Sequence, residues 1–142
     1  MIRPYHPTDS DALLDLWLRA SLQAHDFVPE TFWYEQLPAM RELYLPLAET
    51  LVLEEQGQVL GFASLHGQRL AALFVSPDAQ GRGLGSQLLD EAKRRRNRLE
   101  LGVYRANTRA VAFYRAGGFV TLDETRDPHT GQPELTMRWS RQ

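Results

Sequence analysis

One stretch organises this chain: Leu70-Ala71-Ala72-Leu73-Phe74-Val75-Ser76-Pro77-Asp78-Ala79-Gln80-Gly81-Arg82-Gly83-Leu84-Gly85-Ser86-Gln87-Leu88-Leu89-Asp90-Glu91. Its apolar start has the length of a strand and stops at Ser76-Pro77, where a short polar turn follows. Three alternating glycines then lead into a segment with helical periodicity. The stretch therefore predicts a strand over residues 69–75, a glycine-rich loop, and a helix that begins near Gly83.

A loop of this kind suits an anion. The start of a helix leaves about four backbone N–H groups without partners and carries a partial positive charge. Gly81, Gly83 and Gly85 bring no side chain that would hold a phosphate away, and Arg82 adds a permanent positive charge. We interpret the loop as a cradle for a pyrophosphate. A glycine-rich connection that only turns the chain is the alternative.

Two common phosphate loops do not fit this pattern. A dinucleotide-binding loop needs G-x-G-x-x-G, but Ser86 and Leu88 stand where the third glycine is required. A Walker loop needs a lysine that is absent here. The pattern Gln80-x-x-Gly83-x-Gly85 instead resembles the acetyl-CoA pyrophosphate motif of the GCN5-related N-acetyltransferases, the GNAT family.

A second block supports the same resemblance. Residues 99–104 are typical of a strand, and the segment from Asn107 to Phe119 is typical of a helix that ends at glycine. This block is similar to the GNAT pattern of a strand, N-x-x-A-x-x-F-Y and then G-F. The resemblance covers nearly the whole chain in element order and is strongest over residues 61–119. Near the N-terminus, Leu16-Trp17-Leu18 and His25-Asp26-Phe27 are similar to patterns of a small bacterial type within the family.

Length and composition are those of one ordinary globular domain. The chain has 142 residues, 43% hydrophobic and 24% charged, and we expect residues 1–142 to form a single domain. It has no apolar stretch long enough for a membrane span, and no signal peptide is expected at the N-terminus, so the sequence favours a cytoplasmic protein. The net charge of −2 gives no reason to expect nucleic acid as a partner, and no membrane partner is expected either. The basic run at 93–98 is expected to be a solvated helix end, and a contact to nucleic acid or phosphate is the alternative.

The remaining pattern predicts an α/β or α+β chain. A short strand at 2–5, a helix over about 9–23 and a second helical segment over 30–47, interrupted near Pro38, come first. A hairpin over 50–65, the two motif blocks and a last hairpin over 120–139 follow. The GNAT resemblance implies a mixed, mostly antiparallel sheet of about six or seven strands with about four helices on both faces. It also implies a V-shaped splay between the two central strands.

The resemblance also implies which residues hold the cofactor, acetyl-CoA. Backbone groups of Phe74 and Val75 would pair with the pantetheine amides as an added strand does. Arg82 and Arg115 are the candidates to meet the phosphates of the ADP part, and surface arginines are the alternative. The full expected set is Phe74, Val75, Gln80, Gly81, Arg82, Gly83, Leu84, Gly85, Ser86, Asn107, Phe113 and Arg115.

The implied chemistry is attack of an amine on a thioester. At pH 7 a lysine amine with a pKa near 10.4 costs about 4.6 kcal/mol to deprotonate, so a lysine acceptor needs a base or a desolvating site. Tyr114 fills the family's tyrosine position and is the expected general acid for the leaving thiolate. Packing of its ring in the core is the alternative.

The general base is less well defined. Glu100 lies on the strand that would line the cleft, and its alternative is a structural carboxylate. His25 lies in the loop between the first two helices, and its ordinary pKa suits a base, although a solvated loop histidine is the alternative. The scattered histidines and the absence of cysteine predict no metal site.

The acceptor side would be built from residues 25–32, with Trp33 and Tyr34 nearby, and from the last hairpin loop around His129. For the aromatic run 32–34, core packing is the favoured interpretation and a place in the cleft wall is the alternative. A protein lysine is the favoured acceptor. A small-molecule amine, a protein N-terminus and a longer acyl group stay open, as does a module that binds acyl-CoA without turnover. Either a monomer or a homodimer is compatible with the sequence.

Overall fold

A computed structural model describes residues 1–141, and in them one mixed sheet holds seven strands. The strands are β1 (Ile2–Pro4), β2 (Glu49–Glu55), β3 (Gln58–His66), β4 (Arg69–Val75), β5 (Arg98–Tyr104), β6 (Val120–Arg126) and β7 (Pro133–Ser140). The helices are α1 (Ser10–Ala24), α2 (Glu30–Ala39), α3 (Leu45–Leu47), α4 (Leu84–Arg95) and α5 (Thr108–Ala116). The expected element order is confirmed.

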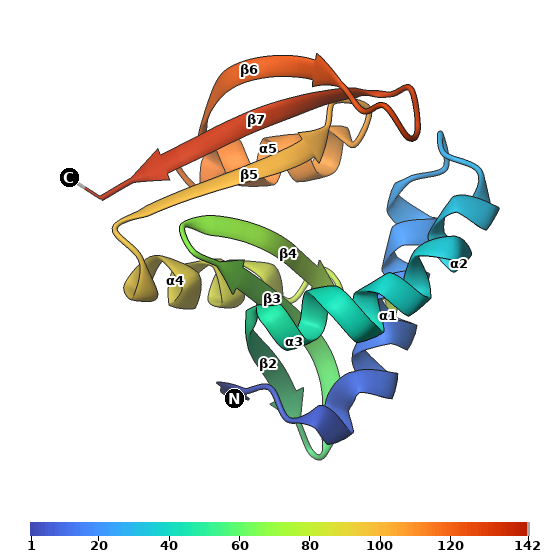
Figure 1. Cartoon of the computed structure of the whole chain (residues 1–142). Helices are drawn as coiled ribbons and strands as arrows, with labels where there is room; N and C mark the ends of the chain where they lie inside the picture. Colours follow the sequence, from blue (N-terminus) through green and yellow to red (C-terminus); the bar gives the residue numbers. More distant parts are fainter. Residues whose placement is uncertain (142) are drawn as a thin grey trace.

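The sheet consists of two antiparallel halves. Its strand order is β1-β2-β3-β4-β5-β7-β6, and only the central β4–β5 pair is parallel. That pair has a single register contact, Arg69 opposite Glu100, beside a backbone hydrogen bond of 2.9 Å from Glu100 N–H to the Gln68 carbonyl. Beyond this junction β4 and β5 diverge (Figure 1). The splay implied by the family resemblance is therefore confirmed.

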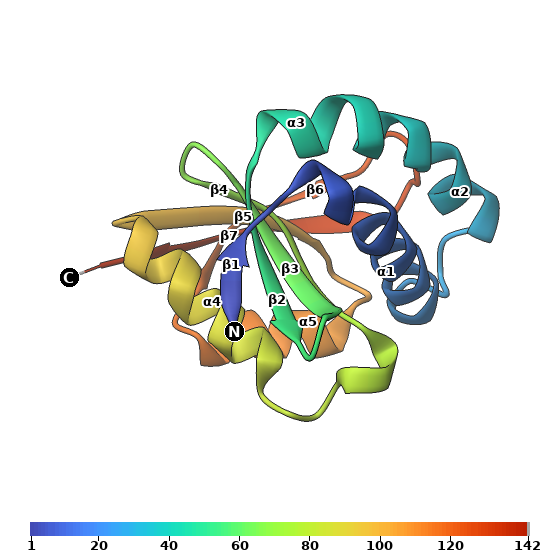
Figure 2. The same ribbon diagram turned by 90° about the horizontal axis from the view of Figure 1, so that it is seen from below.

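The helices cover the sheet on both faces (Figure 2). On one face, α1 and α2 bury a core that includes Leu13, Trp17 and Trp33 against Val52 and Phe62. On the other face, α4 and α5 bury a core that includes Leu88 and Met137. Strand β3 carries the unbroken buried run Leu60–Leu65, as expected for a strand that is covered on both faces.

The second helical segment spans the predicted residues but breaks slightly later than Pro38. Pro38 lies inside α2, and a π-helical turn, Met40–Tyr44, joins α2 to α3. Proline lacks an N–H and crowds the preceding turn, so a widened turn at this point is physically reasonable. The turn leads into Leu45, which is buried in the core.

No helix among residues 1–141 has both the length and the apolar character that a membrane span requires.

At one edge of the sheet, β6 has no buried residue.

Candidate active site

The glycine loop has the geometry of an anion site. Gly81 and Gly83 have φ values of +82° and +76°, in the left-handed region that favours glycine. Gly83 is the N-cap of α4, and the first hydrogen bond that enters the helix is 3.2 Å long, from Gln87 N–H to the Gly83 carbonyl. A Cβ at Gly81 or Gly83 would meet no atom within 4 Å. These glycines therefore leave open space beside the free N–H groups of the helix start.

A cleft of about 560 Å³ begins at this loop and runs between the ends of β4 and α5. We call it the glycine-loop cleft. It is lined by Ala20, Gln23, Ala24, Asp26, Leu73, Phe74, Val75, Ala79, Gln80, Gly81, Gly83, Leu84, Gly85, Ser86, Ala106, Asn107, Thr108, Arg109, Ala110, Phe113 and Tyr114. The structure thus brings most of the predicted cofactor residues to one cleft.

Gln80 braces the loop. Its side-chain amide donates to the Val75 carbonyl at 3.3 Å and to the Gln23 side chain at 3.0 Å. The end of β4, the glycine loop and α1 are therefore tied together.

The two arginines that were predicted to meet the phosphates, Arg82 and Arg115, lie elsewhere in the structure. Arg82 makes two hydrogen bonds, of 2.8 and 2.9 Å, to the carboxylate of Glu55, and Arg115 is exposed on the last turn of α5. Neither lines the cleft among the described residues, whereas Arg109 does. Arg109 was missed because no motif marks it. Only its position in the sequence could have indicated it: α5 starts at Thr108, so Arg109 lies in the first turn, which faces the glycine loop.

Asn107 connects the two helices beside the cleft. Its side-chain oxygen caps α5 by accepting from Ala110 N–H at 3.2 Å. Its side-chain nitrogen lies 3.3 Å from Nε2 of His25, the residue at the C-terminal end of α1. Asn107 therefore positions the start of α5 and meets the end of α1.

His25 is buried and packed, unlike a solvated loop histidine. It is 8% exposed, and its ring stacks on Trp33 with centroids 4.7 Å apart. Burial lowers the pKa of His25 from 6.5 to about 4, so the ring is neutral at pH 7. When Nε2 accepts from Asn107, the ring proton lies on Nδ1, which has no hydrogen-bond partner among residues 1–141. His25 is a weak base in this state.

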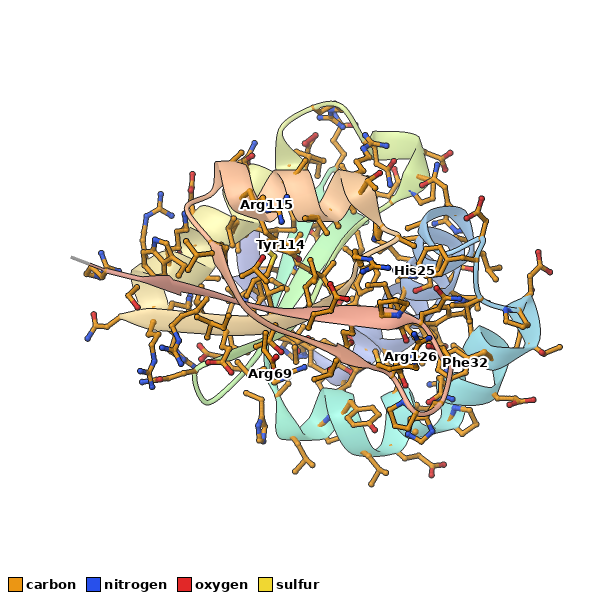
Figure 3. The ribbon with its side chains drawn as sticks, turned by 90° about the horizontal axis from the view of Figure 1, so that it is seen from above. His25, Phe32, Arg69, Tyr114, Arg115 and Arg126 are labelled. Carbon is orange, nitrogen blue, oxygen red and sulfur yellow. The ribbon has the colours of Figure 1, made fainter. Side chains whose placement is uncertain are left out.

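Tyr114 reaches the cleft from the core. It is 8% exposed and packs edge-to-face against Phe113 and Phe119, with centroid distances of 5.2 and 5.5 Å. Burial raises the pKa of Tyr114 above its ordinary value of 10.0, so the hydroxyl stays protonated at neutral pH. In Figure 3, Tyr114 extends from α5 toward the sheet. Its hydroxyl is therefore a protonated group in an apolar wall.

Glu100 lies away from the cleft. It faces Arg138 of β7, whose Nη2 is 3.2 Å from its carboxylate, and it stands at the closed end of the splay. Among residues 1–141 the cleft lining does not include it. The structure therefore does not bring Glu100 and Tyr114 together.

The predicted acceptor segments do meet. Gln132 of the last hairpin loop donates to the Phe27 carbonyl at 3.4 Å, and the Tyr104 hydroxyl donates to Asp127 at 2.6 Å. Phe27 and Tyr104 also pack edge-to-face, with centroids 5.7 Å apart. Glu134 of β7 pairs with Tyr104, and Gly102 lies two residues before Tyr104 on the same face of β5. We call the surface formed by Phe27, Gly102, Tyr104, Asp127 and Glu134 the hairpin face. Trp33 is buried in the core, whereas Tyr34 is exposed.

Comparisons with known proteins agree with this geometry. The family model described as acetyltransferase (GNAT) domain matches residues 46–121. The peptidyl-lysine N-acetyltransferase YiaC of Escherichia coli K12 is 38% identical over 140 residues, which cover 98% of this chain and 96% of YiaC. The peptidyl-lysine N-acetyltransferase YjaB of Salmonella typhimurium is 31% identical over 133 residues, which cover 93% of this chain and 91% of YjaB.

The solution structure of apo YjaB from Escherichia coli has the same fold. Its TM-score is 0.86 at 30% sequence identity, and the match covers 100% of this chain and 98% of that one. The expected similarity to a small bacterial type is confirmed. A matched domain of this extent and relatives aligned over nearly their full length lead to one conclusion: the chain belongs to the GNAT family of N-acetyltransferases.

Proposed function

We propose that this protein transfers an acetyl group from acetyl-CoA to the side-chain amine of a protein lysine, by direct attack in a ternary complex. One observation carries the proposal. A single cleft joins a helix start that suits a pyrophosphate to the β4–β5 opening, and Tyr114 forms part of its wall.

The lining of the cleft suits the chemistry of acetyl-CoA. The N–H groups from Arg82 to Ser86 would hold the pyrophosphate, and the open space over Gly81 and Gly83 gives it room. The unpaired edge of β4 at Phe74 and Val75 would bond the pantetheine amides. Asn107, Phe113 and Leu84 would line the path of the pantetheine arm.

The transfer forms a C–N bond and breaks the C–S bond of the thioester. The thiolate leaves with a pKa near 8.5, and Tyr114 would donate its proton through a hydrogen bond to the sulfur. Because burial raises the pKa of Tyr114, complete proton transfer is harder than from an exposed tyrosine. A hydrogen bond that shortens as charge develops on sulfur is the favoured form of this assistance.

The two predicted bases have different support. His25 borders the cleft through Asn107, but its pKa of about 4 makes it a poor proton acceptor at neutral pH. Glu100 is ion-paired to Arg138 and stands outside the cleft lining of residues 1–141. A role for Glu100 therefore requires an ordered water that relays the proton.

The lysine acceptor is supported by the names of YiaC and YjaB, both peptidyl-lysine N-acetyltransferases, and by the loop-framed hairpin face. The test is calorimetric titration of acetyl-CoA, with dephospho-CoA and NAD as controls. Thiol release is then measured with lysine peptides, peptides that offer only an N-terminal amine, and small amines.

Micromolar binding with release that depends on a lysine peptide is the expected result. Thiol release only with N-terminal amines or small amines would show that the acceptor is not a lysine side chain. Binding without release would indicate a module that binds acyl-CoA without turnover, and absence of binding would reject the function.

A further inference from the structure

On the hairpin face, β5 carries a glycine, Gly102, and the carboxylate of Glu134 lies beside the space that a side chain would occupy there. Gly102 lies between Glu100 and Tyr104 on β5, two residues beyond the junction with β4. A Cβ at Gly102 would lie 3.2 Å from Oε2 of Glu134 and 3.3 Å from Nη2 of Arg69. Glu134 belongs to β7 and pairs with Tyr104, so its side chain leans along the sheet across the missing side chain.

Among the described residues, no direct ion pair or hydrogen bond explains the position of Glu134. Among residues 1–141, no lysine, arginine or histidine nitrogen lies within 4.0 Å of its carboxylate, and its side chain makes no hydrogen bond. The nearby carboxylates differ: Glu100 pairs with Arg138, and Asp127 accepts from Tyr104. Glu134 is therefore the carboxylate of this face that is left without a direct partner.

Glu134 is placed to act on the amine from one side of the sheet, while Tyr114 acts on the thiolate from the other. Beyond the Arg69–Glu100 junction the strands separate, and Gly102 lies on the part of β5 that borders the opening. In Figure 3, Arg69 and Tyr114 lie on opposite sides of the sheet. Because Glu134 and Arg69 converge over Gly102, the Glu134 carboxylate lies on the Arg69 side of the sheet, opposite Tyr114, and among residues 1–141 it stands outside the lining of the glycine-loop cleft.

We propose that Glu134 is the proton acceptor for the attacking amine, which reaches the β4–β5 opening over Gly102. This inference rests on the proposed lysine acetyltransferase function. The Glu134 carboxylate takes one proton from the lysine ammonium, directly or through one water, and later releases it to solvent. The neutral nitrogen forms the C–N bond as the C–S bond breaks. The proton that this nitrogen then loses replaces the one that Tyr114 gives to the thiolate.

The charges around Glu134 suit this role. Burial raises the pKa of Glu134, and repulsion from Asp127 raises it further, while Arg69 on β4 opposes the shift. On β5, the Tyr104 hydroxyl faces the same region, and burial followed by its bond to Asp127 raises its pKa, so it stays neutral. A carboxylate with a raised pKa is a better match to an amine than an ordinary one.

The test is the isosteric variant Glu134→Gln, assayed with acetyl-CoA and a lysine peptide that the wild type acetylates. We expect kcat/KM for the peptide to fall by about 10² to 10³ at pH 7, with an unchanged Kd for acetyl-CoA. The loss should shrink as pH rises, because more lysine is then already neutral. Glu124→Gln, which removes an exposed carboxylate of β6, is the matched control and should behave as wild type.

A second variant distinguishes loss of the carboxylate from a structural defect. In the double variant Gly102→Glu with Glu134→Ala, a carboxylate returns to the same space from β5, and at least a tenfold recovery over Glu134→Ala is expected. An unchanged rate in Glu134→Gln, or a loss that is equal at every pH, overturns the inference and leaves the acetyltransferase function intact. If the wild type releases no thiol with any lysine peptide, the proposed function fails as well.

Discussion

The glycine-loop cleft and the hairpin face meet at the β4–β5 opening, but they are built in different ways. Much of the cleft comes from backbone groups and missing side chains in two local segments, 73–86 and 106–114. The hairpin face takes side chains from the α1–α2 loop, from β5 and from both sides of the last hairpin loop. A site made of backbone is expected to be common to a family, whereas one made of side chains from distant segments is free to change its acceptor.

The largest test of this contrast is Tyr114→Phe, which removes the one cleft group proposed to transfer a proton. We expect kcat to fall by about 10² to 10⁴ while acetyl-CoA affinity stays unchanged, because the ring keeps its contacts with Phe113 and Phe119. Steady-state kinetics and calorimetry measure the two effects. An unchanged kcat would remove Tyr114 from the mechanism.

Gly83→Asp tests whether the cleft depends on bare backbone. It places a side chain and a negative charge at a φ of +76°, and we expect the Kd for acetyl-CoA to rise by at least about 100-fold. Gly57→Asp is the matched control, because Gly57 has a φ of +78° and open space but lies in the β2–β3 turn, away from the cleft. Equal losses in both variants would point to misfolding.

His25 lies where the two regions join, and its burial predicts an acid sensitivity. Its folded-state pKa of about 4 is below the ordinary 6.5, so between these values the unfolded state binds the proton more readily. The free energy of unfolding should therefore fall as pH drops from 6.5 to 4, by up to about 3 kcal/mol.

Urea unfolding at several pH values measures this slope. His25→Gln should flatten it, whereas His129→Gln, at an exposed position, should keep it. A wild-type slope that persists in His25→Gln would assign the sensitivity to other groups.

The smallest expected effect is a difference in acetyl-CoA binding between variants of two arginines of α5. Arg109 lines the cleft and Arg115 does not. We expect Arg109→Ala to weaken acetyl-CoA binding by about three- to tenfold, with the difference shrinking at high salt, because an exposed charge contributes modestly and is screened. Arg115→Ala should bind as wild type does. The reverse order would restore the prediction made from the sequence.

The sequence predicted the parts of this molecule that local patterns encode. The strand, glycine loop and helix of residues 69–95 were predicted together because their apolar period and their glycines report local backbone geometry. Asn107 and Tyr114 followed from their place in a motif, and both line the cleft.

Side-chain partners that are distant in sequence could not be predicted. Arg82 is held by Glu55, and Glu100 by Arg138, through contacts that no local spacing indicates. The burial of His25 depends on Trp33 and on Asn107, which is 82 positions away in sequence. Glu134 became apparent only when the register between β5 and β7 placed it across Gly102.

The single contact between β4 and β5 has one more consequence, for self-association. Beyond it, each strand presents a row of unpaired N–H and C=O groups toward the other, which is an open sheet edge inside the molecule. Exposed edges of this kind invite pairing with other polypeptides and lead to aggregation. Here α1 and α5 both border the opening, so any second polypeptide that pairs with this edge must do so between two helices (Figure 2).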